Sequence, residues 1–301
     1  MEINQPNQTH NPLTQLALLL LLAGAGIVFG SIAVIAITSF ALHVPLTGIA
    51  DALLKPENIQ LSRIVQAGAT FLYMALPAII FGRIISRKPF AALGFNDKIN
   101  LRQIALVAAI VFVSLLLSSV LGDINKMIPI PADWAKKFQQ MEDAYNDQVL
   151  LLTAMKTPAD YMVSLLLIAL LPAIFEEMFF RGAVQKVLIK LFSNPFIGIL
   201  ITSIFFSAIH LSFYGFAPRM FLGMMLGYLF YFSKNLWLNI TAHFLNNTVA
   251  LTQMYLLSRQ GKLTADAMDD SVPYYYGIAA AIGLYVFFVQ FKKEGEKQLA
   301  D

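Results

Sequence analysis

The 301-residue chain is 58% hydrophobic and only 13% charged, whereas a soluble domain usually carries about 25% charged residues. A soluble protein needs a polar surface, so this composition excludes an ordinary soluble domain and indicates a membrane protein. The formal net charge of +3 gives no reason to expect a nucleic-acid partner, which requires clustered Lys and Arg. The absence of cysteine excludes disulfides, thiolate metal sites and cysteine nucleophiles.

Long apolar runs follow one another along the chain, and a run of about 20 residues is long enough to span a bilayer as a helix. The first run, 13–44, exceeds the length of a signal-peptide core, so we expect a retained span rather than a cleaved signal. The candidate spans are 13–42, 64–85, 104–121, 161–175 with an extension, 195–211, 216–232, 236–257 and 274–291. These runs predict an all-α, polytopic membrane bundle of about eight transmembrane helices.

Basic residues gather in four of the segments between these runs, and basic loops stay on the cytoplasmic side of a membrane. If the chain crosses eight times, all four lie on one side, which predicts that both termini are cytoplasmic in an integral protein of the cell membrane. The other side then receives Asp266, Asp269 and Asp270 and the mixed-charge stretch 123–160. The basic residues are Arg83, Arg87, Lys88, Lys98 and Arg102; Arg181, Lys186 and Lys190; Lys234; and Lys292, Lys293 and Lys297.

The one long polar stretch, 131–156, carries apolar side chains at intervals of three and four residues. Trp134, Phe138, Met141 and Tyr145 therefore share a face of a helix, which is typical of a helix that lies at the membrane surface. A plain connector is the simplest interpretation, and a functional lid is the alternative.

Ionisable residues inside apolar helices are the informative signal, because each costs about 2.5–3.5 kcal/mol at the bilayer centre. Glu176, Glu177 and Arg181 fall within six residues of an apolar run. Glu177 and Arg181 are four residues apart and lie on one helix face, so they can form an ion pair. Glu176 lies about 100° around the helix, points elsewhere, and has no local partner. A carboxylate in that position suits general acid–base chemistry, whereas an ion pair at the membrane edge is the structural alternative for the other two.

Two further motifs follow in consecutive apolar segments. His210 closes the sequence Phe-Ser-Ala-Ile-His at the end of one run, and His243 and Asn247 share a face near the start of another. Peptide hydrolysis needs an activated water, a proton donor and stabilisation of an oxyanion. Glu176 is suited to take the proton from water, His210 to orient that water, and His243 with Asn247 to bind the oxyanion. Two His and one Glu are also a plausible zinc ligand set, so the residues leave open whether the site is metal-free or binds Zn²⁺.

The ordered motifs Glu-Glu-x-x-x-Arg, Phe-x-x-x-His and His-x-x-x-Asn on successive membrane helices resemble those of the CPBP or Abi family of intramembrane proteases. This family comprises type II CAAX prenyl endopeptidases and bacteriocin-processing proteins. The resemblance covers Glu176–Asn247, about a quarter of the chain. It implies Glu176 as the general base, His210 as its partner, and His243 and Asn247 at the oxyanion, with Glu177 and Arg181 in support. It implies no certain cofactor, and metal use within the family is disputed.

We therefore expect a single membrane domain over 1–301, with N-terminal spans at 13–122, an extramembrane amphipathic connector at 123–160, catalytic helices at 161–257, and a last span and cytoplasmic tail at 258–301. The expected partners are the lipid bilayer and a membrane-associated peptide or protein substrate, either prenylated or bacteriocin-like. A non-catalytic immunity or scaffold protein is one alternative. A proton-coupled transporter is the other, since it would also use intramembrane Glu, Arg and His.

One geometric difficulty accompanies this hypothesis. With the simple span boundaries, Glu176 falls near the cytoplasmic end of the fourth span and His210 near the far end of the fifth. Two arrangements would bring them together. Either the fourth span continues past Arg181 toward Leu191, or the chain breaks after His210 at Gly215 and Pro218.

Overall fold

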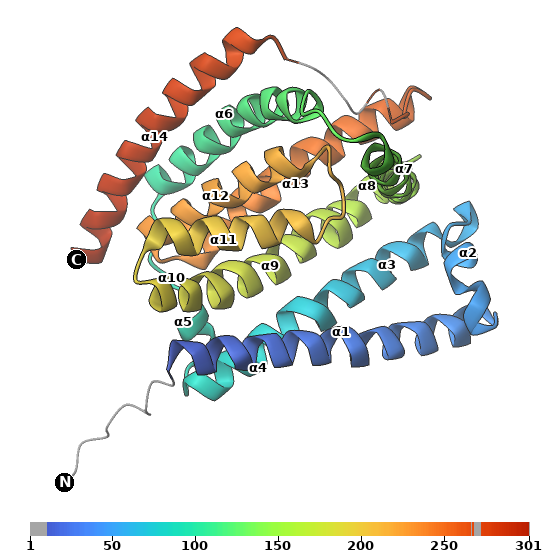
Figure 1. Cartoon of the computed structure of the whole chain (residues 1–301), viewed down its shortest axis with the longest axis horizontal. Coiled ribbons are helices and arrows are strands. Elements are labelled where there is room, and N and C mark those ends of the chain that lie inside the picture. The colour runs from blue at the N-terminus through green and yellow to red at the C-terminus, as the bar shows by residue number, and fades with distance from the viewer. Residues whose placement is uncertain (1–10, 266, 268–271, 301) are drawn as a thin grey trace.

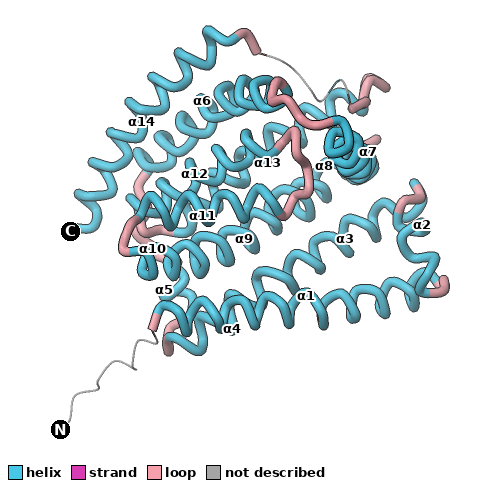
Figure 2. The backbone as a smooth tube through the Cα atoms, in the orientation of Figure 1, coloured by secondary structure: helices cyan, strands magenta, loops and turns pink. Residues whose placement is uncertain are grey.

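The computed structural model describes residues 11–265, 267 and 272–300, and within these the chain folds into helices without any β-strand (Figures 1 and 2). The expected all-α class is confirmed. The α-helices are α1 Pro12–Leu42, α2 Ile49–Leu53, α3 Ile59–Thr70, α4 Leu76–Ile85, α5 Pro89–Leu93, α6 Leu101–Lys126, α7 Ala132–Thr153, α8 Pro158–Ser164, α9 Leu171–Glu177, α10 Lys186–Phe192, α11 Pro195–Ala208, α12 Phe216–Ser233, α13 Leu236–Arg259 and α14 Tyr274–Ala300.

Five of the described helical stretches are long and apolar enough to cross a membrane: Pro12–Leu42, Pro56–Ile85, Leu101–Lys126, Pro158–Phe192 and Tyr274–Gln298. The chain is an integral membrane protein. The expected count of eight is not confirmed, because α11 has only 14 residues and the polar residues of α12 and α13 lower their hydropathy. All eight predicted runs nevertheless form helices.

The stretch Pro158–Phe192 is one continuous helical run in which α8, α9 and α10 are joined by wider π-helical turns, η4 Leu165–Leu170 and η5 Met178–Gln185. A similar turn, η3 Phe71–Ala75, joins α3 to α4. Pro172 and Pro77 are the second residues after the ends of η4 and η3. Proline has no N–H to donate and its ring crowds the preceding turn, and a wider turn accommodates both effects.

This run settles the geometric difficulty and corrects one prediction. The fourth span continues past Arg181 to Phe192, so Glu176 lies near its middle. Arg181, Lys186 and Lys190, which we expected in the loop after this span, are therefore helical residues. Arg181 does not interrupt the helix, because Glu177 neutralises its charge within the bundle. The chain also breaks after His210, as the second arrangement predicted: α11 ends at Ala208 and Gly215 is the N-cap of α12, although Pro218 lies within the first turn of α12.

The helices pack in layers around α9–α13, with α6 and α14 on one side and α1, α3 and α4 on the other (Figure 1). Small residues allow the closest approaches. A Cβ at Gly26 would meet the Leu72 backbone of η3, and a Cβ at Gly227 would lie 2.6 Å from the Ile199 side chain of α11. Gly30 and Gly223, four residues before or after these positions, also leave no room, because an added Cβ would lie 3.0 Å from the Leu72 and Ser203 side chains respectively.

The basic segments come together at one end of the bundle. Lys186 Nζ donates to the Ala92 carbonyl at 2.7 Å, and Asn235 Nδ2 donates to the Asn96 and Lys98 carbonyls at 2.9 Å. The start of α1 and the end of α14 lie at the same end (Figure 1). We call this end of the bundle, where Lys98 and Lys186 lie, the basic end. The acidic residues Asp266, Asp269 and Asp270 expected on the other side lie outside the described residues.

The amphipathic stretch forms α7, which begins at Ala132 and ends at Thr153. Phe138 stacks on Phe213 with ring centroids 4.3 Å apart, while Trp134 is largely exposed. The C-terminus of α7 is held by Arg63 of α3, a fully buried residue. Arg63 Nε donates to the Leu152 carbonyl at 2.9 Å and Nη2 to the Ala154 carbonyl at 3.4 Å, where a cation also complements the helix dipole.

Replacing Arg63 by Met should destabilise the protein, because two buried carbonyl groups lose a charged donor, each loss being worth roughly 1.5–3 kcal/mol. Denaturant unfolding in detergent would measure the change. The exposed Arg83 of α4 offers a matched control, and Arg83→Met should change stability by less than about 0.5 kcal/mol. Equal stability of the two variants would contradict this role of Arg63.

Candidate active site

A buried ion pair lies at the centre of the bundle. Glu177, the last residue of α9, and Arg181, in η5, are both fully buried, and Arg181 Nη1 donates to Glu177 Oε1. Arg181 Nη2 also donates to the Gly223 carbonyl of α12 at 3.0 Å. The predicted pair is therefore present, and its complete burial within the bundle excludes a solvent-exposed surface pair. A pair so buried needs further hydrogen bonds to offset its desolvation.

Helix α13 supplies those hydrogen bonds. His243 Nδ1 donates to Glu177 Oε1 at 2.8 Å, and Asn239 Nδ2 donates to Glu177 Oε2 at 3.3 Å and to the Leu226 carbonyl at 2.6 Å. Sequence reasoning missed Asn239. The available signal was its spacing, since Asn239 precedes His243 by four residues and shares its helix face. Glu177 thus accepts hydrogen bonds at both carboxylate oxygens.

Glu176 has a different environment from its neighbour. Its side chain is 14% exposed whereas that of Glu177 is 0% exposed. Its Oε2 lies 3.8 Å from His243 Nε2, which is too long for a hydrogen bond. The expectation that Glu176 points elsewhere is therefore only partly right, because the two carboxylates approach opposite nitrogens of the same imidazole. Of the two carboxylates, Glu176 is therefore the one that neighbouring side chains hold less firmly.

His210 reaches the cluster through an aromatic ring. The Phe206 ring packs edge-on against His210 at 5.3 Å and against His243 at 5.8 Å, and the Arg181 guanidinium lies 4.8 Å from its centre. His210 Nδ1 donates to the Phe206 carbonyl at 2.8 Å. The backbone turns directly after His210, where Leu211 has a positive φ of 53°. The Phe-x-x-x-His spacing thus places the Phe206 ring against both histidines and its carbonyl within hydrogen-bond distance of His210.

Asn247 lies one turn beyond His243 on α13 and is partly exposed. Its Nδ2 donates to the Ala169 carbonyl of η4 at 3.4 Å, and its Oδ1 accepts from Asn246 Nδ2 at 3.3 Å. The structure thus joins Glu176, Glu177, Arg181 and His243 by direct contact. It brings His210 to this group through Phe206 and places Asn247 beside it without a direct hydrogen bond.

The described residues contain no group of three or more His, Asp or Glu side chains arranged to hold a metal ion. His243 is the only one of the two histidines that approaches a carboxylate here, and its Nδ1 is committed to Glu177. The predicted ligand set of two His and one Glu therefore does not fit the arrangement of the described residues.

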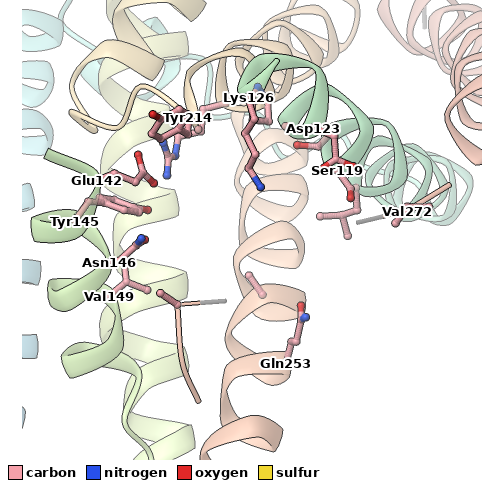
Figure 3. Close-up of a pocket in the computed structure, with 18 of the residues that line it drawn as sticks. Ser119, Asp123, Lys126, Glu142, Tyr145, Asn146, Val149, Tyr214, Gln253 and Val272 are labelled. Atoms are coloured by element: carbon pink, nitrogen blue, oxygen red, sulfur yellow. The ribbon is translucent and has the colours of Figure 1, made fainter. Parts of the chain in front are cut away.

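A cavity of about 840 Å³ lies beyond the loop that follows His210, between α6, α7, α12 and α13 (Figure 3). Tyr214 and Gly215 of that loop line it, as do Val249 and Ala250, which follow Asn247 on α13. The site residues themselves are not part of its wall. The cavity therefore borders the cluster and does not contain it.

Comparison with known proteins bears on the same part of the chain. Residues 158–249 match the model of a family described as type II CAAX prenyl endopeptidase Rce1-like. The chain contains an Rce1-like segment. It spans less than a third of the 301 residues, includes all six candidate residues and confirms the resemblance noted above. Searches of curated proteins and of solved structures gave no match.

The buried pair can be tested without an activity assay. Arg181→Met should destabilise the protein by about 3–5 kcal/mol, because it leaves the Glu177 charge buried without its cation. Adding Glu177→Leu should recover part of this loss, since a buried pair replaced by apolar groups is often nearly neutral. Unfolding of both single variants and the double variant in detergent would measure the coupling. Strictly additive effects would show that the two side chains do not depend on each other.

Proposed function

We propose that this protein is an intramembrane endopeptidase that hydrolyses a peptide bond of a membrane-associated peptide or protein with glutamate-activated water. The observation that carries the proposal is the contrast between adjacent carboxylates. Glu177 is fixed by Arg181, His243 and Asn239, whereas Glu176 is partly exposed and 3.8 Å from His243. The Rce1-like segment indicates CAAX-type intramembrane protease activity.

In this mechanism Glu176 removes a proton from water as the water oxygen attacks the carbonyl carbon of the substrate. The tetrahedral intermediate then collapses, the C–N bond breaks, and Glu176 returns the proton to the leaving amine. The products are a carboxylic acid and an amine, and no electron acceptor is required. One carboxyl group thus serves first as base and then as acid, a task that a paired carboxylate such as Glu177 performs poorly.

The hydrogen bonds suggest roles for the other residues. His210 donates from Nδ1 to the Phe206 carbonyl, so a neutral ring has Nε2 free to accept a hydrogen bond from the attacking water. His243 donates from Nδ1 to Glu177 and, when protonated, donates from Nε2. Together with the Asn247 amide it would stabilise the developing oxyanion. Glu177, Arg181 and Asn239 act as positioning residues through His243.

The proposal extends to the membrane and the substrate class. Basic loops remain cytoplasmic, so the basic end and both termini would face the cytoplasm in the cell membrane. Prenylated CAAX-type proteins and bacteriocin-like peptides are the two substrate classes that we consider. A library of fluorogenic peptides with and without an isoprenyl group would discriminate between them.

Glu176→Gln should reduce cleavage of such peptides by about 10²–10⁴-fold, the contribution expected of a general base. The amide preserves the shape of the side chain but cannot take the proton. Initial rates of the purified protein in detergent would measure the effect. The exposed Glu296 provides the control, because Glu296→Gln should cleave at the normal rate.

The same assay separates hydrolysis from a non-catalytic role. A protein that binds library peptides but releases no fluorescence would favour the immunity or scaffold alternative. Cleavage by Glu176→Gln at the normal rate would remove Glu176 from the mechanism.

Chelation should leave the proposed activity intact, because the described site residues do not converge as a three-ligand set. Peptide cleavage would be measured before and after prolonged dialysis against a strong chelator, and the metal content of both samples would be determined by mass spectrometry. Loss of activity together with a stoichiometric loss of zinc would contradict the glutamate mechanism.

A further inference from the structure

The cavity beside the cluster has a mixed lining, in which charged side chains stand among apolar ones such as Leu115, Val149 and Met254. Its volume of about 840 Å³ lies within the range of about 300–1,000 Å³ typical of ligand sites. Asp123 and Lys126 of α6, Glu142 of α7 and Arg219 of α12 contribute charges of both signs. Figure 3 shows Asp123 and Glu142 on different walls, with Lys126 between them. A lining of this kind suits a polar ligand better than an acyl chain.

The position of the cavity follows from the directions of the helices. Helix α6 runs from Leu101 at the basic end to Lys126 at the cavity, and α12 runs from the cavity back to the basic end at Ser233. Figure 1 places α7 at the end of the bundle opposite the start of α1 and the end of α14. The cavity therefore lies at the end opposite the basic loops.

Arg219 is the cationic group of the wall that lacks a counter-ion among the described residues. Its guanidinium lies 4.6 Å from the Tyr145 ring centre, and its buried Nη1 has no hydrogen-bond partner. It also rests on Gly215, where an added methyl group would overlap Nη1, Cζ and Nη2. The wall acid Glu142 accepts instead from Ser212 Oγ at 2.7 Å. A guanidinium held in this way is suited to bind a carboxylate.

A second feature of the same wall favours a negative group. Helix α12 begins here with Phe216, has no acidic residue in its first turn, and is 18 residues long. The N-terminus of a helix carries a partial positive charge, which adds to the charge of Arg219. The first-turn N–H groups of Phe216 and Ala217 are already bonded, to the Phe213 carbonyl and to Asn125 Oδ1, so the helix start adds only this dipole and Arg219 is the group that a ligand can pair with.

The wall of the cavity includes the loop that follows His210, one of the proposed catalytic residues. The loop from His210 to Gly215 forms part of its wall, and three contacts tie that loop to neighbouring elements. Ser212 bonds to Glu142 of α7, Phe213 stacks on Phe138 of α7, and the Phe213 carbonyl accepts from Asn125 Nδ2 of α6 at 2.9 Å. A ligand in the cavity would therefore lie directly against the segment that carries His210.

Resting on the proposed function, we propose that this cavity binds the substrate polypeptide through a carboxylate that pairs with Arg219. The substrate reaches it from the face of the membrane opposite the basic loops. The ligand is a polar, acidic peptide segment, and its carboxylate belongs either to an acidic side chain or to a free C-terminus.

The side of access can be measured independently of catalysis. The chain has no cysteine, so a single introduced cysteine is the only thiol. Asn146→Cys in the cavity wall should react with a membrane-impermeant maleimide in intact cells. Lys98→Cys, exposed at the basic end, should react only after permeabilisation. The reverse pattern would overturn the proposed side of access.

Recognition of the carboxylate can be measured by protection of the same thiol. Peptide pools with one fixed Glu should slow labelling of Asn146→Cys in detergent at roughly tenfold lower concentration than matched Gln pools, the advantage expected of a charge-assisted bond. A second pair of pools, with a free or an amidated C-terminus, distinguishes the terminal carboxylate from the side chain. Protection by either acidic form supports the proposal and identifies the source.

Arg219→Gln should abolish the difference between acidic and neutral pools, whereas Arg219→Lys should retain part of it. An unchanged labelling rate without peptide verifies that the cavity is intact in each variant. If acidic and neutral pools protect Asn146→Cys equally when Arg219 is intact, the role of Arg219 is overturned. Neither experiment requires cleavage, so failure here is distinct from a failure of the Glu176→Gln test.

Discussion

The structure depends on one buried negative charge. The Glu177 carboxylate would be prohibitively costly to place in an apolar bundle by itself, and three side chains from two parts of the chain converge on it. Arg181 comes from the same helical run, and His243 and Asn239 come from α13. Satisfying this charge fixes the rotation of α13 against α9. It also fixes α12, because Arg181 and Asn239 each donate to a carbonyl of that helix.

Glu176 acquires its properties from this arrangement. The hydrogen-bond donors near the two carboxylates bond to Glu177. Glu176 therefore lies beside Nε2 of His243, whose ring is already oriented by the bond from Nδ1 to Glu177. Two chemically identical side chains at consecutive positions thus have different environments: Glu177 is fixed by three donors, and Glu176 is 3.8 Å from His243. The segment 158–249 that matches the Rce1-like family is the part of the chain in which this division occurs.

Local spacing allowed much of this arrangement to be predicted. The Glu177–Arg181 pair, the shared face of His243 and Asn247 and the amphipathic α7 follow from helical periodicity, and hydropathy identified the long apolar helices. Spacing could not reveal partners that are backbone carbonyls on other helices. Arg63 and Asn239 belong to this class, because they bind the Leu152 and Leu226 carbonyls respectively. The count of eight spans is not confirmed, since α11 is too short and α12 and α13 are too polar for a simple hydropathy criterion.

The shortness of α11 has a consequence for the surrounding lipid. Its 14 residues extend about 21 Å, less than the hydrocarbon thickness of about 30 Å, and Phe196 and Phe205 on its surface are about half exposed. A helix of this length requires the bilayer to thin beside it or ends below the headgroups. In either case the interface dips toward His210, and bulk solvent approaches the bundle interior without a transmembrane pore. Acyl-chain length would then govern how readily that region is wetted.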